Sequence, residues 1–498
     1  MSGQNGQGLP GVADLGVLPL FRPARTRVSG GHGLPAIPSP SPVGVAGDRA
    51  TEATSEVDGV DWALVQALRA EVADQLAREG RAGSGETERE LGRAIISGLV
   101  AAETRARQVA ANPWSIASEQ AHAKAVFDAV FGMGRFQPLL EDDTVENVIV
   151  TGCDRVFTEH TDGSVTARDP VAESDEELIA WLDFIASRSE ANARSFTRSR
   201  PHLHLRLDDG SRLAAAAWVT PRPSVVIRRH RLQRVTLPEL VERGTLPAVA
   251  ASFLAACVRS GLSVVVSGPQ GAGKTTLLRA LCHEIPRGEM IGTFETEYEL
   301  HLHQMLDLHP VVHAWEARPG SGEIGPDGKQ AGEITLAECL TNSFRFNLAR
   351  LVVGEVRGPE VLVLIKAMQS ARGSLSTTHS VTALGAMEKL ISCAMEMGPA
   401  ITREVAARML GSAIDIVVQM RMVSTPGGRP GESTRQRWVS EIVHVMPGEE
   451  AAGFSTNTVF TTDGGSRQLR PAVLTDSLRD LEWHGFDLDG YQRGGVSA

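Results

Sequence analysis

A glycine-rich segment in the middle of the chain has the residue types that bind phosphate groups. The β-branched run Ser263-Val264-Val265-Val266-Ser267 is followed by Gly268-Pro269-Gln270-Gly271-Ala272-Gly273-Lys274-Thr275-Thr276, and helix-forming residues come next. The pattern G-x-x-x-x-G-K-[ST] between a strand and a helix predicts a loop whose backbone N–H groups surround the phosphates of a nucleoside triphosphate. We expect Lys274 to reach the β- and γ-phosphates and Thr275 to ligate Mg²⁺.

The identity of the lysine strengthens this interpretation, because lysine is scarce in a chain that carries most of its positive charge on arginine. The lysines are Lys124, Lys274, Lys329, Lys366 and Lys389. The alternative, a glycine-rich turn that happens to contain a lysine, does not explain the surrounding strand and helix.

A second apolar strand, Leu351-Val352-Val353, ends in Gly354-Glu355. In a parallel sheet with the strand before the phosphate loop, Glu355 would lie at the carboxyl end beside the γ-phosphate. A carboxylate in that place can hold a magnesium-bound water or orient the water that attacks. A surface cap is the usual role of a lone glutamate after a strand, but the upstream loop favours the functional interpretation.

Between these two segments a strand runs into three carboxylates at alternate positions, Glu295, Glu297 and Glu299. They would face one way if the chain stayed extended, and their mutual repulsion would then favour a cation or an activated water nearby. A solvated acidic loop is the alternative.

The segment from Ser374 to His379 places small and hydroxyl-bearing residues before a histidine. His379 is a candidate to contact or sense the γ-phosphate. A structural histidine with satisfied hydrogen bonds is the alternative.

The composition bounds the kinds of protein that this chain can be. It has 498 residues, of which 42% are hydrophobic and 22% charged, and a formal net charge of −11. The length predicts two or three domains, and the acidic balance does not favour a nucleic-acid binder. The cysteines are scattered singly, which indicates neither a zinc site nor a disulfide framework. No apolar run approaches the ~20 residues that cross a bilayer, so we expect no transmembrane segment.

The chain divides by composition and periodicity into six segments. Residues 1–58, rich in Gly, Pro and Ser, are expected to be a disordered tail. Residues 59–135 predict a helical module, 136–231 an α+β domain, and 232–246 a linker with a short helix. Residues 247–446 alternate apolar strands and amphipathic helices, which favours a doubly wound α/β sheet. Residues 447–498 are polar and glycine-rich, and we assign them no role.

These motifs, in this order, resemble the type II/type IV secretion ATPase superfamily, and most closely its CpaF-type members of tight-adherence pili and conjugation systems. An acidic box of the form E-D/T-x-x-E-L is matched by Glu295 to Leu300, and a segment further on by Glu316-Ala317-Arg318-Pro319. The acidic strand is matched by Arg350 to Gly358, and the histidine box by Ser374 to His379. The resemblance reaches back to Glu146-Asn147-Val148 and to Asp209-Gly210-Ser211-Arg212-Leu213, so that it covers roughly residues 60 to 446.

The resemblance implies a RecA-like P-loop ATPase domain with an α+β N-terminal domain and a preceding helical module. It implies ATP and Mg²⁺ as cofactors, with Glu355, Glu295, Glu299 and His379 catalytic, and with Glu295 and Glu355 holding the metal through water. It implies a homo-hexamer in which N-terminal arginines approach the nucleotide; Arg228 is the first candidate, followed by Arg206 and Arg212. The motor would be cytoplasmic, peripheral to the inner face of the membrane, and would drive an inner-membrane platform protein without binding nucleic acid directly.

Three departures from the family pattern bear on catalysis. The histidine box lacks its usual opening Gly-His, since Ser370-Ala371-Arg372-Gly373 stands there. The usual Arg-Pro-Asp before the acidic strand is Asn347-Leu348-Ala349, and Thr296 replaces an aspartate. Two alternatives to a hydrolysing motor therefore remain: a nucleic-acid translocase of the same architecture, and an assembly scaffold that binds nucleotide with little hydrolysis.

Overall fold

The fold is that of a computed structural model. It describes residues 59–79, 85–188, 196–207, 209–229, 234–318, 320, 330–358, 360–426, 433–448, 453–462 and 466–495. The predicted disordered tail, residues 1–58, lies outside the described residues.

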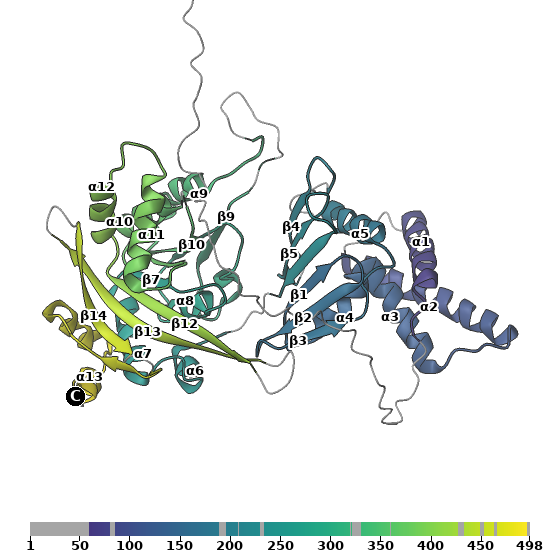
Figure 1. Ribbon diagram of the computed structural model, residues 1–498. Coiled ribbons are helices and arrows are strands. Elements are labelled where there is room, and N and C mark those ends of the chain that lie inside the picture. The colour runs from purple at the N-terminus through teal and green to yellow at the C-terminus, as the bar shows by residue number, and fades with distance from the viewer. Residues whose placement is uncertain are drawn as a thin grey trace, which may run out of the picture. The chain divides into compact units, whose positions relative to one another are not determined.

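Three helices form the first part of the described chain (Figure 1). They are α1 (Trp62–Glu79), α2 (Gly85–Val109) and α3 (Ile116–Phe131). Val65, Val72, Val100 and Val126 form their common core, and Ser115 caps α3 by accepting a hydrogen bond from the Ser118 N–H. Each of these helices thus turns apolar residues toward the core that it shares with the other two.

A six-stranded antiparallel sheet follows, in the order β3-β2-β1-β6-β5-β4. Its elements are η2 (Gly134–Phe136), α4 (Gln137–Glu141), β1 (Val145–Thr151), β2 (Arg155–His160), β3 (Val165–Arg168), α5 (Asp175–Arg188), β4 (His202–Arg206), β5 (Arg212–Ala216) and β6 (Ser224–Arg228). One face of the sheet packs on α5, through residues such as Val148, Ile227, Leu178 and Leu182. The strands alternate between buried and more exposed residues, as expected for a sheet with one covered face.

The opposite face of this sheet carries a line of polar residues that the strand register places side by side. Glu159 pairs with Asn147, Asn147 with Arg228, Arg228 with Arg212, and Arg212 with Arg206. We call these five residues the polar row. Three of its members are the arginines that the resemblance nominates, so residues spread over 23 positions of sequence are brought into one line by antiparallel pairing.

The second sheet has nine strands, in the order β15-β14-β13-β12-β7-β11-β10-β8-β9. In this order, β9, β8, β10, β11, β7 and β12 run parallel to one another, whereas β12, β13, β14 and β15 run antiparallel. They are β7 (Val264–Ser267), β8 (Ile291–Glu295), β9 (Val312–Glu316), β10 (Arg350–Val356), β11 (Leu375–Thr378), β12 (Ile416–Pro426), β13 (Ser433–Pro447), β14 (Phe454–Thr462) and β15 (Leu469–Pro471). The mixed α/β class expected for this region is confirmed.

Helices cover both faces of the parallel part (Figure 1), which explains why β7, β8 and β11 are buried along their whole length. Val264 and Val266 face a core with α6 (Leu237–Glu242), α7 (Ala248–Ser260) and α8 (Lys274–Cys282). Val265 faces the opposite core. That core is formed with α9 (Leu336–Ser343), α10 (Val361–Ser370), α11 (Ala383–Met395) and α12 (Arg403–Gly411). The short η3 (Leu302–Gln304) lies between β8 and β9 in the chain.

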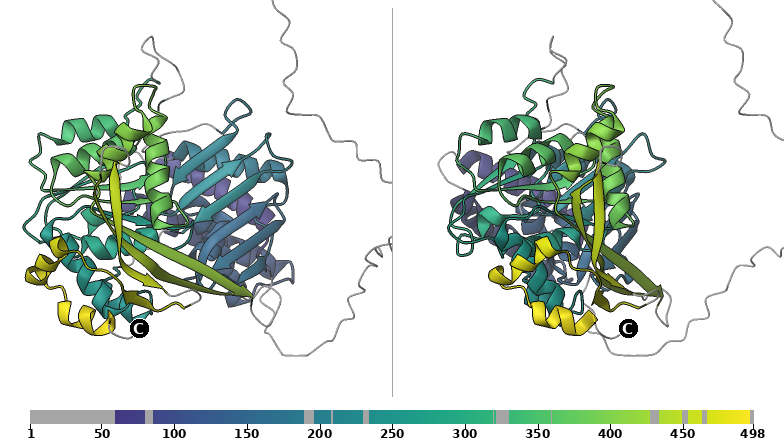
Figure 2. Two further views of the ribbon diagram at one scale, coloured as in Figure 1. Left: turned by 60° about the vertical axis from the view of Figure 1, so that its left-hand side comes forward. Right: turned by 90° about the vertical axis from the view of Figure 1, so that its left-hand side faces the viewer.

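The end of the chain belongs to the core of this second sheet. After β14 and β15 come η4 (Asp476–His484) and α13 (Leu488–Gly495), and in Figure 2 these yellow helices lie beside the teal helices that include α7. Phe460, Leu481, Phe486 and Tyr491 are buried in the same cluster as Phe253 of α7. The segment to which the sequence assigned no role thus completes one layer of the domain.

Candidate functional site

The phosphate loop lies between β7 and the first residue of α8, as the pattern predicts. Its backbone depends on glycine: φ is 76° at Gly271 and 88° at Gly273, values that side-chain-bearing residues rarely adopt. A Cβ at Gly268 would lie 2.9 Å from the carbonyl oxygen of Met420 on β12. The loop is therefore shaped by left-handed backbone and by close approach of a neighbouring strand.

Lys274, His379 and Glu355 form a chain of contacts from three different elements. Lys274 Nζ lies 3.1 Å from His379 Nδ1 and 3.1 Å from the Pro269 carbonyl oxygen. His379 Nε2 contacts Glu355 Oε1. Because an ammonium group can only donate, Nδ1 accepts and the imidazole proton on Nε2 faces the carboxylate. Residues separated by up to 105 positions therefore meet at the carboxyl ends of β7, β10 and β11.

The strand order explains this meeting. β11 lies between β7 and β10 in the sheet, so His379, which follows β11, sits between Lys274 and Glu355. Glu355 pairs with Thr377 in the register, with a bulge after Val353. The prediction that Glu355 lies at the end of a strand parallel to β7 agrees with this geometry, although β11 separates the two strands.

The two charged ends of this chain have shifted pKa values. Burial alone would raise the pKa of Glu355, but hydrogen bonds from His379 and Arg357 outweigh it and hold the pKa at about 2. Burial lowers the pKa of Lys274 to about 8, with a smaller opposing effect from Glu355. Glu355 is therefore a stable anion at neutral pH, whereas the charge of Lys274 depends on pH just above neutrality.

The acidic segment does not stay extended. β8 ends at Glu295, which is 2% exposed, and its Oε2 accepts hydrogen bonds from the backbone N–H groups of Glu299 (2.7 Å) and Leu300 (2.9 Å). The expectation of three carboxylates facing one way is therefore wrong, because Glu295 turns the chain back on itself. Burial raises the pKa of Glu295 to about 7, although these N–H groups lower it.

Glu299 faces the phosphate loop and an arginine of the polar row. Its Oε2 accepts a hydrogen bond from the Thr275 hydroxyl at 3.2 Å, and its Oε1 accepts one from Arg212. Arg212 also donates to the Glu297 backbone oxygen at 2.8 Å. The positive charge that balances this segment is therefore an arginine side chain.

The donors near Thr275 suit magnesium. A hydroxyl and a carboxylate are the hard oxygen ligands that this ion prefers, and it usually takes only one or two carboxylates alongside substrate phosphates. The Glu295 Oε1 atom is buried and has no hydrogen-bond partner among the residues that the structure describes. No cluster of three His, Cys, Asp or Glu residues suited to a metal occurs among the described residues.

The three nominated arginines reach different parts of the site. Arg206 contacts Glu316 at 3.4 Å and lies 5.2 Å from the centre of the Tyr298 ring. Arg212 binds the acidic segment, and Arg228, which is exposed, is near enough to lower the pKa of Lys274, though less than burial does. Of the three, Arg228 is the one whose charge affects the pKa of Lys274.

The sequence analysis did not nominate two arginines that the structure places at the site. Arg357 donates to Glu355 Oε2 at 2.6 Å; its position two residues after the strand-end glutamate was a usable clue. Arg437 of β13 donates to the Gly271 carbonyl oxygen at 2.7 Å, and its only signal was alternation with Arg435 along a strand.

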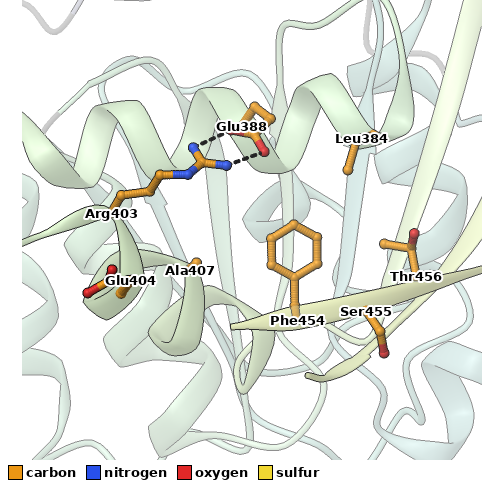
Figure 3. Close-up of a pocket in the computed structure, with 8 residues that line it drawn as sticks. All are labelled: Leu384, Glu388, Arg403, Glu404, Ala407, Phe454, Ser455 and Thr456. Atoms are coloured by element: carbon orange, nitrogen blue, oxygen red, sulfur yellow. Dashed lines mark hydrogen bonds and ion pairs between the residues drawn. The ribbon is translucent and has the colours of Figure 1, made fainter. Parts of the chain in front are cut away.

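A separate pocket of about 350 Å³ lies between α11, α12 and the start of β14 (Figure 3). Arg403 and Glu388 form a two-point ion pair at its rim, with N–O distances of 2.6 and 2.7 Å. None of the residues predicted to act on nucleotide lines this pocket.

The central sheet, with the glycine-rich loop after β7 and an acidic strand end two strands away, defines an α/β protein of the RecA type. The chain belongs to the family described as type II/IV secretion system protein, whose model matches residues 132–444. The predicted superfamily is thereby confirmed.

Proteins of several organisms match parts of the chain. The conjugal transfer protein TrbB of Rhizobium radiobacter is 25% identical over 314 residues, which cover 61% of this chain and 85% of that protein. The type IV secretion system protein PtlH of Bordetella pertussis is 32% identical over 193 residues, 38% of this chain and 51% of PtlH. An uncharacterized protein of Methanocaldococcus jannaschii is 26% identical, and the chain spans only 45% of its length.

Solved structures of two ATPases also match parts of the chain. The VirB11 ATPase of the Brucella suis type IV secretion system is 24% identical with a TM-score of 0.30, covering 65% of this chain and 96% of VirB11. The Legionella pneumophila ATPase DotB is 17% identical with a TM-score of 0.44, covering 64% and 81%. The assignment therefore rests on the family match and on the site. Among the described residues, no helix has the length and apolar character needed to cross a membrane.

Proposed function

We propose that this protein is an ATP-hydrolysing motor of a secretion, pilus-assembly or conjugation machine, of the CpaF type, acting as a homo-hexamer on an inner-membrane platform protein. The observation that carries the proposal is the meeting of Lys274, His379 and Glu355 beside a phosphate loop of the required backbone. Membership of the secretion family supports the kind of machine.

In this proposal the residues divide the work of hydrolysis. Lys274 and the backbone N–H groups of the loop between Gly268 and Thr276 bind the triphosphate, which displaces the lysine from His379. A water attacks the γ-phosphorus in line, and the bond from phosphorus to the β–γ bridging oxygen breaks to leave ADP and inorganic phosphate. Mg²⁺, held near Thr275 with Glu295 and Glu355 acting through water, would neutralise phosphate charge.

Glu355 positions the attacking water and does not act as a strong base. With a pKa of about 2 it has little affinity for a proton, and the loose transition state of phosphoryl transfer needs little proton removal before the bond breaks. His379 would report the loss of the γ-phosphate by returning to Lys274. Glu299, through Thr275 and Arg212, would link that event to the N-terminal sheet.

The test is phosphate release by purified wild-type protein and by Lys274→Ala, with ATP and Mg²⁺ and with and without DNA. Removing an interaction with the transferred group is expected to slow turnover by about a hundredfold or more. Tight ATP binding by wild type without phosphate release would support the scaffold alternative, which the missing first histidine motivates. Turnover that depends on added DNA would support a translocase.

A further inference from the structure

Arg437 on β13 holds the phosphate loop from outside. Its Nε donates to the Gly271 carbonyl oxygen at 2.7 Å, across 166 residues of sequence. The contact is close along the side chain too, because a Cβ at Gly273 would lie 3.6 Å from Arg437 Cδ. One arginine thus donates to the loop at Gly271 and lies next to Gly273, two glycines of the loop with positive φ values.

The same guanidinium group reaches the N-terminal sheet. Arg437 Nη2 lies 3.5 Å from Glu146 Oε2 of β1, and Arg435, two residues earlier on the same face of β13, lies 3.4 Å from the same oxygen. Arg435 also pairs with Glu159 of the polar row. These four side chains are between 14% and 27% exposed, so salt screens their attraction less than it screens a surface pair.

The contact at Gly271 fixes a peptide that phosphate binding requires. The carbonyl oxygen of Gly271 is held by Arg437, and the N–H of the same peptide, on Ala272, donates to the Pro269 carbonyl oxygen at 3.3 Å. Lys274 Nζ donates to that Pro269 oxygen as well. A loop held on both sides of one peptide loses less conformational freedom when a ligand binds, which raises affinity.

We propose that Arg437 is a positioning residue for the phosphate loop, and that its ion pair with Glu146 holds the Arg437 side chain in the position from which it donates to Gly271. The N-terminal sheet would then control nucleotide affinity through this arginine. The inference rests on the proposed function in one respect, that the loop binds ATP. It assigns to β13 and β1 a role that neither the phosphate-loop motif nor the polar row supplies.

The experiment uses the full chain and two measurements on each variant. The first is the affinity for a fluorescent ATP analogue with Mg²⁺, and the second is amide hydrogen exchange of residues 268–276 without nucleotide. The variants are Arg437→Ala, Arg437→Lys, Glu146→Gln and the double variant Arg437→Ala with Glu146→Gln. Arg421→Ala, which removes an arginine that lines a pocket formed by β12 and β13 with the residue 381–382 turn, is the matched control.

Arg437→Ala is expected to weaken binding about tenfold, which corresponds to the ordering of one peptide, and to speed exchange in the loop without nucleotide. Arg437→Lys keeps the charge but cannot make both contacts, so it is expected to remain weak. Glu146→Gln should weaken binding about threefold, and the double variant should match Arg437→Ala, since Glu146 acts through Arg437. The control should bind as wild type does.

Wild-type affinity and wild-type loop exchange in Arg437→Ala would overturn the inference alone. Full rescue by Arg437→Lys would show that only charge matters and would overturn the positioning role. Additive effects in the double variant would overturn the claim that Glu146 acts through Arg437. Should Arg437→Ala fail to fold, Arg437→Lys and Glu146→Gln still decide the question. Failure of wild type itself to bind the analogue would overturn the proposed function, and the inference with it.

Discussion

At the scale of single residues, the site is organised by carboxylates and cations that share partners. Glu355 is held by His379 and Arg357, and Glu299 by Thr275 and Arg212. Two of the three glutamates that were grouped as catalytic, Glu355 and Glu295, differ in their surroundings. At Glu355 side-chain donors oppose the effect of burial on the pKa, whereas at Glu295 the opposing hydrogen bonds among the described residues come from backbone N–H groups. We therefore expect Glu355 to be anionic throughout the physiological range and Glu295 to titrate near neutrality.

Nucleotide affinity should fall as the pH rises past about 8. Burial lowers the pKa of Lys274 to about 8 in the nucleotide-free protein, so the lysine is charged below that pH and loses its proton above it, and bound phosphate must restore the proton. Linkage then predicts about tenfold weaker binding of an ATP analogue per pH unit above the pKa. Titration of the analogue between pH 7 and 9.5 measures it.

Arg at this position stays charged over the whole range, so Lys274→Arg provides the control. Its affinity should be lower overall but independent of pH in the same window. A wild-type affinity that is flat from pH 7 to 9.5 would contradict the assignment of Lys274 as a buried phosphate ligand.

At the scale of elements, the end of the chain stabilises the sheet that carries the site. Phe460 of β14 is fully buried and packs against Phe253 and Tyr491. Phe460→Ala should therefore cost about 3–5 kcal/mol of unfolding free energy, as large-to-small changes in a core do. Trp483 lies on the neighbouring η4 but is 89% exposed, so Trp483→Ala should change the unfolding free energy by less than about 0.5 kcal/mol.

Urea unfolding of the two variants measures the difference. Equal stability of Phe460→Ala and Trp483→Ala would mean that the segment after β13 does not pack as described. The sequence could not predict this packing, because the apolar residues of the segment occur in short groups separated by polar residues and glycines. Their common core exists only once β13, β14 and α7 are brought together.

Other elements could be predicted from sequence because their signals are local. The β-branched run before Gly268 and the apolar run before Gly354 gave two strands of the sheet and placed Lys274 and Glu355 at their ends. The turn after Glu295 was missed, because a buried carboxylate that accepts two backbone N–H groups leaves the same residue pattern as an extended acidic strand. Arg437 was missed because its contact spans 166 residues.

At the scale of the whole molecule, the polar row connects the N-terminal sheet with the acidic segment. Arg212 and Glu299 are 19% and 24% exposed. Arg212→Ala would leave a mostly buried carboxylate without this partner, and we expect a loss of about 1–2 kcal/mol of unfolding free energy. Arg206, 44% exposed in its pair with Glu316, should contribute no measurable stability.

Thermal or urea unfolding of Arg212→Ala and Arg206→Ala, without nucleotide, makes the comparison. Indistinguishable curves for the two variants would contradict a role for Arg212 in joining the sheet to the acidic segment. In the proposed function, Arg212 is the residue through which Glu299 would pass the effect of phosphate loss to the N-terminal sheet.

The central claim is that ATP bound at the phosphate loop is hydrolysed by water that Glu355 positions. Glu355→Gln keeps the size of the side chain and removes its charge, so the most direct measurement is analogue affinity and single-turnover phosphate release on the same preparation. We predict affinity within about threefold of wild type, with phosphate release slowed about a hundredfold or more. Release at the wild-type rate by a variant that binds ATP normally would contradict the account.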